Sequence, residues 1–386
     1  MKIKLVKKVI CMVVLAFSLQ LISAQHANEV MVFFGTRVDK PDRGFSIAYF
    51  DTITGKLTNP KFVEASPAPS YFVIHPKGKR FYSVNALDSF PKKWSGGGIS
   101  AYKLNPSREK LKLIDRVPSG GAGPCFINFD KGLSHVLVAN YNGGTIAVVK
   151  LNPDGSFGPQ TSLVKHTGKS LNLTRQDKAH AHSVKVDPSG RFVLSCDLGL
   201  DKVFIYRYDG KSGTLLPNNP EFVALKPGSG PRHFSFHPNG KFVYVINELS
   251  ATITVFSWLS DKGQLKEIET VQTLPADFKG ANTAAEIEVH PNGKFLYCTN
   301  RGHNSISTFS VDSVTGKLRQ LQQISSQGDF PRNFAIDPSG RWIILSNHNS
   351  DNVAVYRVDT TAGLLTSTGQ TVSIPNPYGI QFLKLK

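Results

Sequence analysis

The stretch GPRHFSFHPNGKFVYVINEL, residues 230–249, holds the pattern that decides the fold. An alternating strand leads into the turn HPNG (237–240), and a strand rich in β-branched and aromatic residues follows at 241–247. Proline presets the backbone of such a turn and glycine supplies a positive φ, so the turn can join two antiparallel strands. The stretch therefore predicts a β-hairpin.

The same turn recurs along the chain. The pattern [HD]-P-x-G stands at 75–78, 187–190, 237–240, 290–293 and 337–340, with a degenerate copy, DKG, at 130–132. The intervals between copies run from 47 to 57 residues, which is the length of four strands and their loops. After each hairpin comes a third strand, such as DKVFIYRY (201–208), and then a less regular fourth. Four antiparallel strands of this kind are typical of one propeller blade.

The two ends of the chain supply one more unit. Residues 30–37 and 44–51, with the segment through 61–63, look like second, third and fourth strands without a first, whereas 376–385 looks like a first strand alone. Joining them completes a blade and removes the exposed edges that an open array would carry. We therefore predict an all-β, seven-bladed β-propeller with four antiparallel strands per blade, closed by the C-terminal strand. The alternative, an open β-solenoid, would leave both partial units unpaired.

The first residues read as a signal peptide. Lys2, Lys4, Lys7 and Lys8 precede an apolar run from Val9 to Ile22, and small residues end at Ala24. This pattern predicts a signal peptide over 1–24, a propeller over 25–386, and export to the periplasm or the extracellular space. A transmembrane anchor is the alternative, but 14 apolar residues are short for a span of about 20. After cleavage no transmembrane span is expected.

Cysteines and charge narrow the classes of function. Without the leader, Cys125, Cys196 and Cys298 remain, and an odd number in strand-like settings argues against a disulfide framework. Loss of four lysines reduces the formal net charge from +17 to +13, a surplus that suits an anionic ligand or acidic surface. No nucleic-acid-binding motif is present, so nucleic acid is not an expected partner. The oligomeric state is left open.

Two registers point to one mouth of the central channel. Five positions before the first residue of each turn, the His or Asp, stand Ser70, Cys125, His182, Arg232, Ala285 and Arg332. Ten positions after that first residue stand Asn85, Asn140, Asp197, Asn247, Asn300 and Asn347, and the next positions are Ala86, Tyr141, Leu198, Glu248, Arg301 and His348. Short amide side chains end strands well, so a structural role explains this second ring; a metal site there would lack a tight cluster of His or carboxylates. We expect no metal and no cofactor.

Ionisable residues gather around these registers. The first strand of each blade starts, and the second ends, at the same mouth of a propeller, so side chains at both positions should meet there. The convergence of acid–base groups and fixed cations on one cavity predicts a functional site. The residues expected near the mouth are His180, His182, Arg232, His233, Glu248, Arg301, Arg332 and His348.

The sequence resembles the lactonase seven-bladed propeller family from about Val30 to the C-terminus. This family includes propeller-type 6-phosphogluconolactonase and the carboxy-muconate cycloisomerase. The most specific segments are AHAHSVKVDPSGRF (179–192), 230–249 and CTNRGHNSISTF (298–309). The resemblance implies catalytic roles for His182, Arg232, Glu248 and Arg301, of which the ungapped pair Arg232 and Glu248 carries over best. His180 is the alternative to His182 in this mapping. His180, His233, Asn247, Asn300, Arg332 and His348 are expected to bind substrate.

The resemblance implies a metal-independent lactonase acting on a sugar-acid lactone. Glu248 or a neutral His182 would activate water, and the arginines would hold anionic groups and the charge of the transition state. Export is a departure, because 6-phosphogluconolactone arises in the cytoplasm. Two alternatives remain: a non-catalytic exported propeller that binds an envelope glycan or protein, and a cycloisomerase of the muconate type. The sequence shows no Ser or Cys nucleophile motif, and an inert, buried thiol is the expectation for Cys125.

Overall fold

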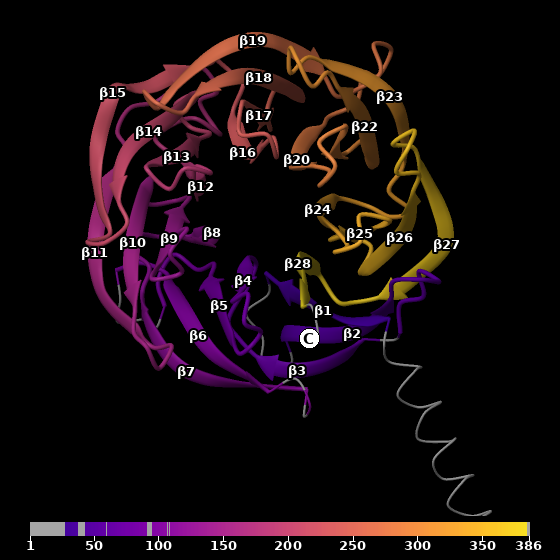
Figure 1. Ribbon diagram of the computed structural model, residues 1–386, viewed down its shortest axis with the longest axis horizontal. Helices are drawn as coiled ribbons and strands as arrows, with labels where there is room; N and C mark the ends of the chain where they lie inside the picture. The colour runs from indigo at the N-terminus through magenta and orange to yellow at the C-terminus, as the bar shows by residue number, and fades with distance from the viewer. Residues whose placement is uncertain are drawn as a thin grey trace, which may run out of the picture.

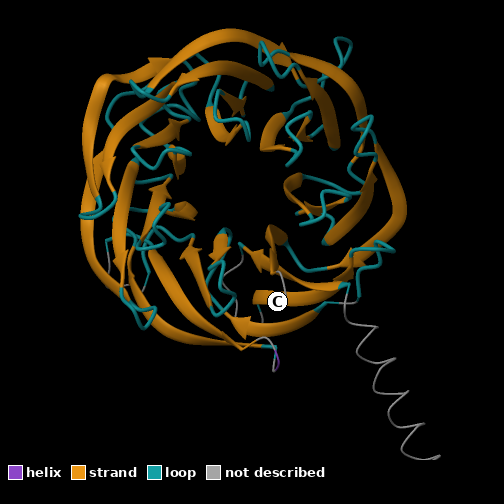
Figure 2. Ribbon diagram, viewed as in Figure 1, coloured by secondary structure: helices purple, strands orange, loops and turns teal. Residues whose placement is uncertain are grey.

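The computed structural model describes residues 28–37, 43–58, 60–90, 95–105, 107 and 109–383. These residues form 28 strands in seven four-stranded antiparallel sheets, arranged as blades around a central channel (Figure 1). Nearly all connections between strands are loops and turns (Figure 2). The predicted seven-bladed propeller is therefore confirmed. The predicted signal peptide, residues 1–24, lies outside the described residues.

Each blade is named here by its order around the ring, and its strands are given from the channel outward. Blade 1 contains β28 (Pro377–Leu383), β1 (Glu29–Thr36), β2 (Gly44–Asp51) and β3 (Lys61–Ala65). Blade 2 contains β4 (Phe72–Ile74), β5 (Arg80–Asn85), β6 (Gly98–Asn105) and β7 (Lys110–Pro118). Blade 3 contains β8 (Pro124–Phe129), β9 (His135–Asn140), β10 (Thr145–Leu151) and β11 (Phe157–Lys165). Blade 4 contains β12 (Ala181–Val186), β13 (Phe192–Asp197), β14 (Lys202–Asp209) and β15 (Thr214–Ala224).

The remaining three blades follow the same order. Blade 5 contains β16 (Pro231–Phe236), β17 (Phe242–Asn247), β18 (Thr252–Leu259) and β19 (Gln264–Gln272). Blade 6 contains β20 (Thr283–Val289), β21 (Phe295–Arg301), β22 (Ser305–Val311) and β23 (Leu318–Ser325). Blade 7 contains β24 (Pro331–Ile336), β25 (Trp342–Asn347), β26 (Asn352–Val358) and β27 (Leu365–Ser373).

Blade 1 closes the ring as the incomplete ends predicted. Its innermost strand, β28, pairs antiparallel with β1, so that Met31 lies opposite Leu383 and Phe34 opposite Ile380. In Figure 1 the yellow C-terminal strand β28 lies beside the indigo strand β1. Because β28 and β1 pair with each other, the two partial units complete one four-stranded blade and neither is left unpaired.

The repeated turn holds neighbouring blades together as well as reversing the chain. Gly240 has a φ of 71°, which glycine adopts without the steric cost of a Cβ, and its N–H donates to His237 O at 2.8 Å. The His237 ring accepts from the Asn239 N–H through Nδ1, so Nε2 carries the proton and donates to Gly293 O at 2.8 Å in blade 6. His290 repeats this bond to Gly340 O of blade 7 at 2.7 Å.

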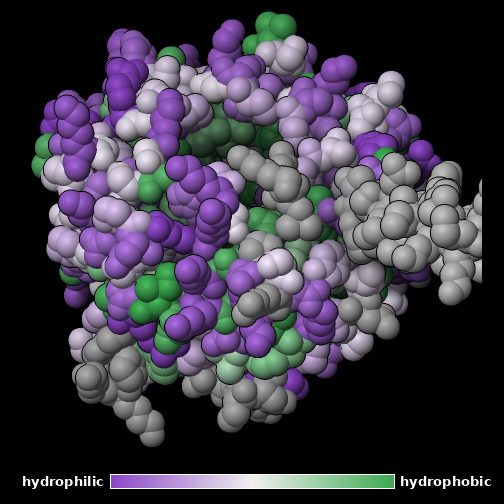
Figure 3. Space-filling model, turned by 60° about the horizontal axis from the view of Figure 1, so that its bottom comes forward, coloured by the Kyte–Doolittle hydropathy of each residue, from purple (hydrophilic) through white to green (hydrophobic). Residues whose placement is uncertain are grey.

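The hydrophobic core is divided among the spaces between blades. Each blade is covered on both faces by its two neighbouring blades. A middle strand such as β17 is therefore buried at all six of its residues. Between blades 5 and 6, Tyr244 and Ile246 pack with Leu296 and Phe309, and each is 1% exposed or less. The face seen in Figure 3 is mostly hydrophilic around a central hollow. No described residue belongs to a helix with the length and apolar character needed to cross a membrane.

Candidate functional site

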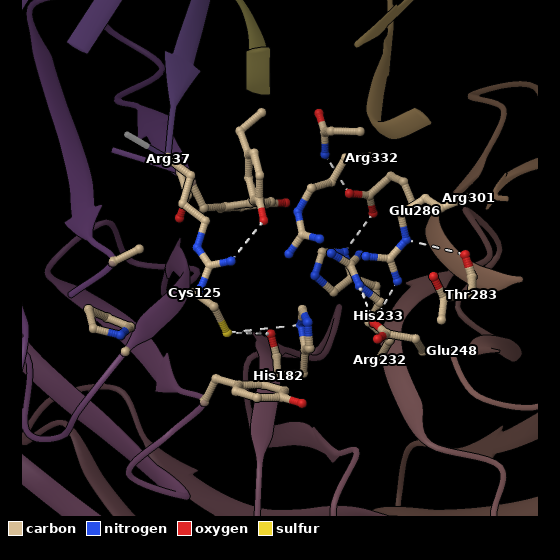
Figure 4. Close-up of a pocket in the computed structure, with 18 of the residues that line it drawn as sticks. Arg37, Cys125, His182, Arg232, His233, Glu248, Thr283, Glu286, Arg301 and Arg332 are labelled. Atoms are coloured by element: carbon tan, nitrogen blue, oxygen red, sulfur yellow. Dashed lines mark hydrogen bonds and ion pairs between the residues drawn. The ribbon is translucent and has the colours of Figure 1, made fainter. Parts of the chain in front are cut away.

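Two positions in most blades build a cavity of about 440 Å³ at one mouth of the channel (Figure 4). One position lies at the start of the innermost strand, and the other lies just past the end of the second strand. The first is the register five positions before each turn, and the second is the position that follows the register of Asn and Asp residues. The lining residues that the argument below uses are Arg37, Tyr71, Cys125, Tyr141, Arg175, His182, Arg232, His233, Glu248, Glu286, Arg301, Arg332, Asn333 and Tyr378.

Glu248 is the centre of a buried charge cluster. Its Oε2 lies 3.1 Å from Arg232 Nε and 2.9 Å from an Nη atom of Arg301, while Oε1 lies 2.5 Å from an Nη atom of Arg175. Arg232, Glu248 and Arg301 are each 4% exposed or less. Burial alone would raise the pKa of the Glu248 carboxyl, but Arg301, Arg232, His182 and Arg175 hold it well below its usual range. Glu248 is therefore an anion at neutral pH.

Backbone carbonyls fix the two buried arginines. Arg232 Nη1 donates to Ala285 O at 2.6 Å, and Arg301 donates to Thr283 O at 3.2 Å and Ala284 O at 2.9 Å. After these contacts, Arg232 Nη2 and Arg301 Nη1 have no protein partner among the described residues. Two pre-oriented donors are thus left for a bound ligand, and Arg232 and Arg301 both line the cavity.

His182 stands beside this cluster with few partners of its own. Its Nδ1 lies 3.9 Å from Cys125 Sγ, and its ring meets Tyr141 and His233 edge to face at 5.4 and 5.0 Å between centroids. Burial lowers the pKa of His182 well below 6.5, and Arg232 and His233 act in the same direction. The imidazole is therefore neutral at pH 7 and can accept a proton. Burial also raises the pKa of the Cys125 thiol, to about 12.

The floor of the cavity is a chain of side chains one residue deeper in the inner strands. Tyr71 stacks on Phe126 with 4.4 Å between ring centroids, and Phe126 meets His233 at 5.1 Å. His233 Nδ1 lies 2.8 Å from Glu286 Oε1, and Asn333 Nδ2 donates to Glu286 Oε2. Burial raises the pKa of Glu286, whereas Arg232 opposes that rise. This chain of contacts links inner strands of blades 2, 3, 5, 6 and 7 beneath the cavity.

A third group of cavity residues, Arg37, Arg332 and Tyr378, lies on the wall formed by blades 7 and 1. The guanidinium of Arg332 lies 4.0 Å from the centre of the Tyr378 ring, and Arg37 Nη1 lies 3.5 Å from the Tyr378 hydroxyl. Among the described residues Arg332 has no carboxylate partner, and its buried Nε has no hydrogen-bond partner. Figure 4 shows Arg37 and Arg332 approaching the cavity from different strands.

Of the ten predicted site residues, six line the cavity: His182, Arg232, His233, Glu248, Arg301 and Arg332. The other four are not among the residues that line it. Asn247 and Asn300 are 0% exposed, and their amides bond Thr252, Thr254, Thr273 and Ser307 within and between loops and strands. This is the strand-ending role of short amides.

The remaining two are histidines with partners behind the wall. His180 stacks on the cavity residue Tyr141 at 4.3 Å and bonds Tyr141 O and Asp177. His348 meets the Tyr378 ring edge to face at 4.9 Å. Both support aromatic residues of the cavity wall from outside it.

The sequence reading missed Arg175, Glu286, Arg37 and Tyr378. Arg175 lies in the long connection between β11 and β12, outside both registers. Glu286 lies one residue past the register that was counted, beside Ala285. Tyr378 and Arg37 occupy the two registers in blade 1, where no turn motif joins the strands. Counting through the split blade would have found both of them.

The described residues contain no cluster of three or more His, Cys, Asp or Glu side chains that could hold a metal ion. The three described cysteines are free thiols. The cavity therefore presents guanidinium, imidazole and carboxylate groups as its chemistry.

Comparison with known proteins gives consistent matches along nearly the whole chain. The family described as "Lactonase, 7-bladed beta-propeller" matches residues 31–382. A 6-phosphogluconolactonase of Bacillus subtilis is 32% identical over 351 residues, which cover 91% of this chain and 97% of that protein. A 6-phosphogluconolactonase of Formosa agariphila is 32% identical over 79% of this chain and 86% of that protein. The solved structure of a periplasmic gluconolactonase of Pseudomonas aeruginosa is 31% identical, with a TM-score of 0.87 over 93% of this chain and all of that one.

Proposed function

Because this chain belongs to the lactonase seven-bladed β-propeller family, we propose that it hydrolyses the lactone of a sugar acid in the cavity at the channel mouth. The relatives named 6-phosphogluconolactonase and gluconolactonase support a lactone hydrolase. The observation that carries the proposal is the set formed by Glu248, its three arginines and the neutral His182 on one wall of the cavity.

The reaction needs a base for water and donors for an oxyanion. The oxygen of a water molecule attacks the lactone carbonyl carbon, and His182 takes one proton from that water. The carbonyl oxygen becomes an oxyanion, which Arg232 Nη2 and Arg301 Nη1 are free to receive. The tetrahedral intermediate then collapses, the bond between the carbonyl carbon and the ring oxygen breaks, and His182 returns the proton to that oxygen. The product is the open-chain hydroxy acid.

His182 fits the role of base better than Glu248. Both oxygens of Glu248 already lie in ion pairs with guanidinium groups, and its pKa is held well below the usual range, so it is a weak base. We infer that Glu248 orients Arg232 and Arg301, while His182 moves the proton. Cys125 lies beside His182, but its raised pKa leaves a protonated thiol, which is a poor nucleophile.

We also propose that the chain is exported and acts as the mature protein. The leader-like residues 1–24 support export, and so does the likeness to a periplasmic gluconolactonase. A small sugar lactone generated outside the cytoplasm would then be the substrate. Metal independence belongs to the same proposal, since the chemistry above uses only side chains of this chain.

A panel of sugar-acid lactones tests the proposal. Hydrolysis by the mature protein would be followed by pH-indicator or carboxylate release, corrected for spontaneous hydrolysis, with and without a chelator. We expect turnover that the chelator does not change and that His182→Gln and Arg232→Gln each reduce by at least tenfold. Full activity in both variants would overturn the site. No turnover of any lactone, together with retention on an envelope glycan, would favour a binding protein instead.

A further inference from the structure

The pair formed by His233 and Glu286 on the cavity floor has no role in the reaction described above. His233 comes from β16 and Glu286 from β20, so their contact joins blades 5 and 6. His233 Nδ1 lies 2.8 Å from Glu286 Oε1, and the two residues are 2% and 4% exposed. A carboxylate bonded to one ring nitrogen of a histidine determines which nitrogen carries the proton and how the ring is oriented.

Two other N–H donors identify Glu286 as the acceptor in this contact. The Ile287 N–H donates to Oε1 at 3.2 Å, and Asn333 Nδ2 donates to Oε2. The orientation of the Asn333 amide is itself fixed, because its Oδ1 accepts from the Ile380 N–H at 3.2 Å. Both oxygens of Glu286 therefore accept hydrogen bonds, and the proton in its contact with His233 belongs to Nδ1 of the imidazole.

His233 with its proton on Nδ1 carries a lone pair on Nε2. Burial, Arg232 and Lys185 hold the pKa of His233 well below 6.5, so the ring is neutral at pH 7. Its Nε2 is buried and has no hydrogen-bond partner among the described residues. A buried acceptor of this kind calls for a ligand or an ordered water molecule. The ring of His182 lies 5.0 Å away between centroids, and both histidines line the cavity, so one water molecule can contact both.

We propose that Glu286 is a positioning residue: it holds His233 as the Nδ1–H tautomer, whose Nε2 accepts a hydrogen bond from the water that attacks the lactone. This inference rests on the proposed lactonase function and adds a second histidine that orients the water. One proton of the water passes to His182. The other proton stays on the oxygen, bonded to His233 Nε2, and becomes the hydroxyl hydrogen of the tetrahedral intermediate. Two acceptors fix the direction of the water, so its lone pair faces the carbonyl carbon before attack.

Glu286→Gln tests the proposal because the amide must turn its NH₂ group toward one of two neighbours. Toward Asn333, two NH₂ groups would face each other, since Ile380 holds the Asn333 oxygen. Toward His233, Nδ1 must become the acceptor, and the proton moves to Nε2. We expect kcat on glucono-lactone to fall at least tenfold with KM within threefold. The NMR shifts of the His233 ring nitrogens, assigned by their loss in His233→Gln, should change from the Nδ1–H to the Nε2–H pattern.

A second substitution should reverse the effect. When Glu286→Gln is combined with Asn333→Asp, the carboxylate at position 333 accepts from the new NH₂ group and from the Ile380 N–H. The amide oxygen then returns to His233 as an acceptor. We expect the double variant to show the Nδ1–H tautomer and a kcat within threefold of wild type. Asn333→Asp alone should be less active than the double variant, because its carboxylate would face that of Glu286. General damage to the fold would not be repaired in this way.

Glu288→Gln is the matched control. Glu288 lies two residues further along β20 and is not among the residues that line the cavity, so kcat and KM should stay within twofold. An equal loss in this variant would overturn the role of Glu286. So would an Nε2–H tautomer in the wild type, a measurement that needs no stable variant. If the wild type turns over glucono-lactone and Glu286→Gln keeps its full kcat, the positioning role fails and the lactonase stands. If the wild type hydrolyses no lactone, the lactonase itself fails.

Discussion

Two buried carboxylates of this propeller, Asp197 and Glu248, lie at neighbouring positions near the end of the second strand of their blades. Their surroundings differ, and so do the roles that we expect for them. Asp197 ends β13 of blade 4, whereas Glu248 follows the end of β17 in blade 5. Asp197 Oδ2 bonds His166 Nδ1 at 2.7 Å, and His166 Nε2 bonds the Tyr206 hydroxyl at 2.8 Å. This carboxylate–imidazole–hydroxyl chain has the parts of a catalytic group, yet none of its residues lines the cavity.

Exposure does not separate the two clusters, but hydrogen bonding does. His166 and His182 are both 4% exposed. Both ring nitrogens of His166 have strong partners, and its ring stacks on Phe204 at 3.9 Å. Among the described residues, the one polar side chain near a ring nitrogen of His182 is the Cys125 thiol, at 3.9 Å. Successive residues of an extended chain point to opposite sides, so one register directs a side chain into the blade and the next directs it into the cavity. A buried network whose polar groups all have hydrogen-bond partners stabilises the fold. A buried group that lacks such partners remains available to react with a ligand.

The largest expected effect is that of Glu248→Gln. The amide keeps the shape of the carboxylate but loses the charge that holds three guanidinium groups together. We expect kcat/KM to fall at least 10³-fold and the free energy of unfolding to fall by about 3 kcal/mol, because removing one partner of a buried ion pair leaves the others uncompensated. Lactone turnover and denaturant unfolding would measure the two effects. Activity within tenfold of wild type would contradict the role of Glu248.

His182→Gln should reduce kcat/KM by about 10³-fold, which is the middle of the usual range for removal of a general base. The free energy of unfolding should change by less than 1 kcal/mol, since His182 has few hydrogen bonds to lose. His180→Gln is the matched control: it lies two residues away, outside the cavity, and should retain activity within a few-fold. Equal losses in the two variants would show that the cavity does not define the reacting histidine.

For His166→Gln we expect the opposite result, a loss of stability with little change in turnover. Loss of the bonds to Asp197 and Tyr206 should cost about 3 kcal/mol of stability, because one bond involves a buried carboxylate. Turnover at a temperature where the variant is folded should stay within twofold. Tyr206→Phe removes only the outer bond and should cost about 1 kcal/mol. A loss of turnover without a loss of stability would place His166 in the reaction and end the contrast with His182.

The fold could be predicted from the sequence because the turn repeats with its strands in fixed register. That register also located His182, Arg232 and Glu248, whose side chains meet in the cavity. The register alone could not show that Glu248 faces the cavity whereas Asn247 does not. Both residues stand at the end of the same strand, but their side chains point in different directions. Arg175 could not be predicted as a site residue, because it lies in the connection between β11 and β12 and the repeat does not determine the path of that connection.

The smallest expected effect, and the most specific to the contrast between the two clusters, is on the pH profile. A general base must be neutral, so kcat/KM falls as pH drops through the pKa of His182. Burial, Arg232 and His233 hold that pKa well below 6.5, so the neutral form persists at a pH where an ordinary histidine is already charged. An unperturbed histidine with a pKa near 6.5 would lose about tenfold between pH 7.5 and 5.5. We expect a clearly smaller loss than that over the same range with a neutral lactone, measured as initial rates against an enzyme-free blank. A midpoint between pH 6 and 7 would instead indicate a base in an ordinary, hydrated environment and would remove His182 from that role.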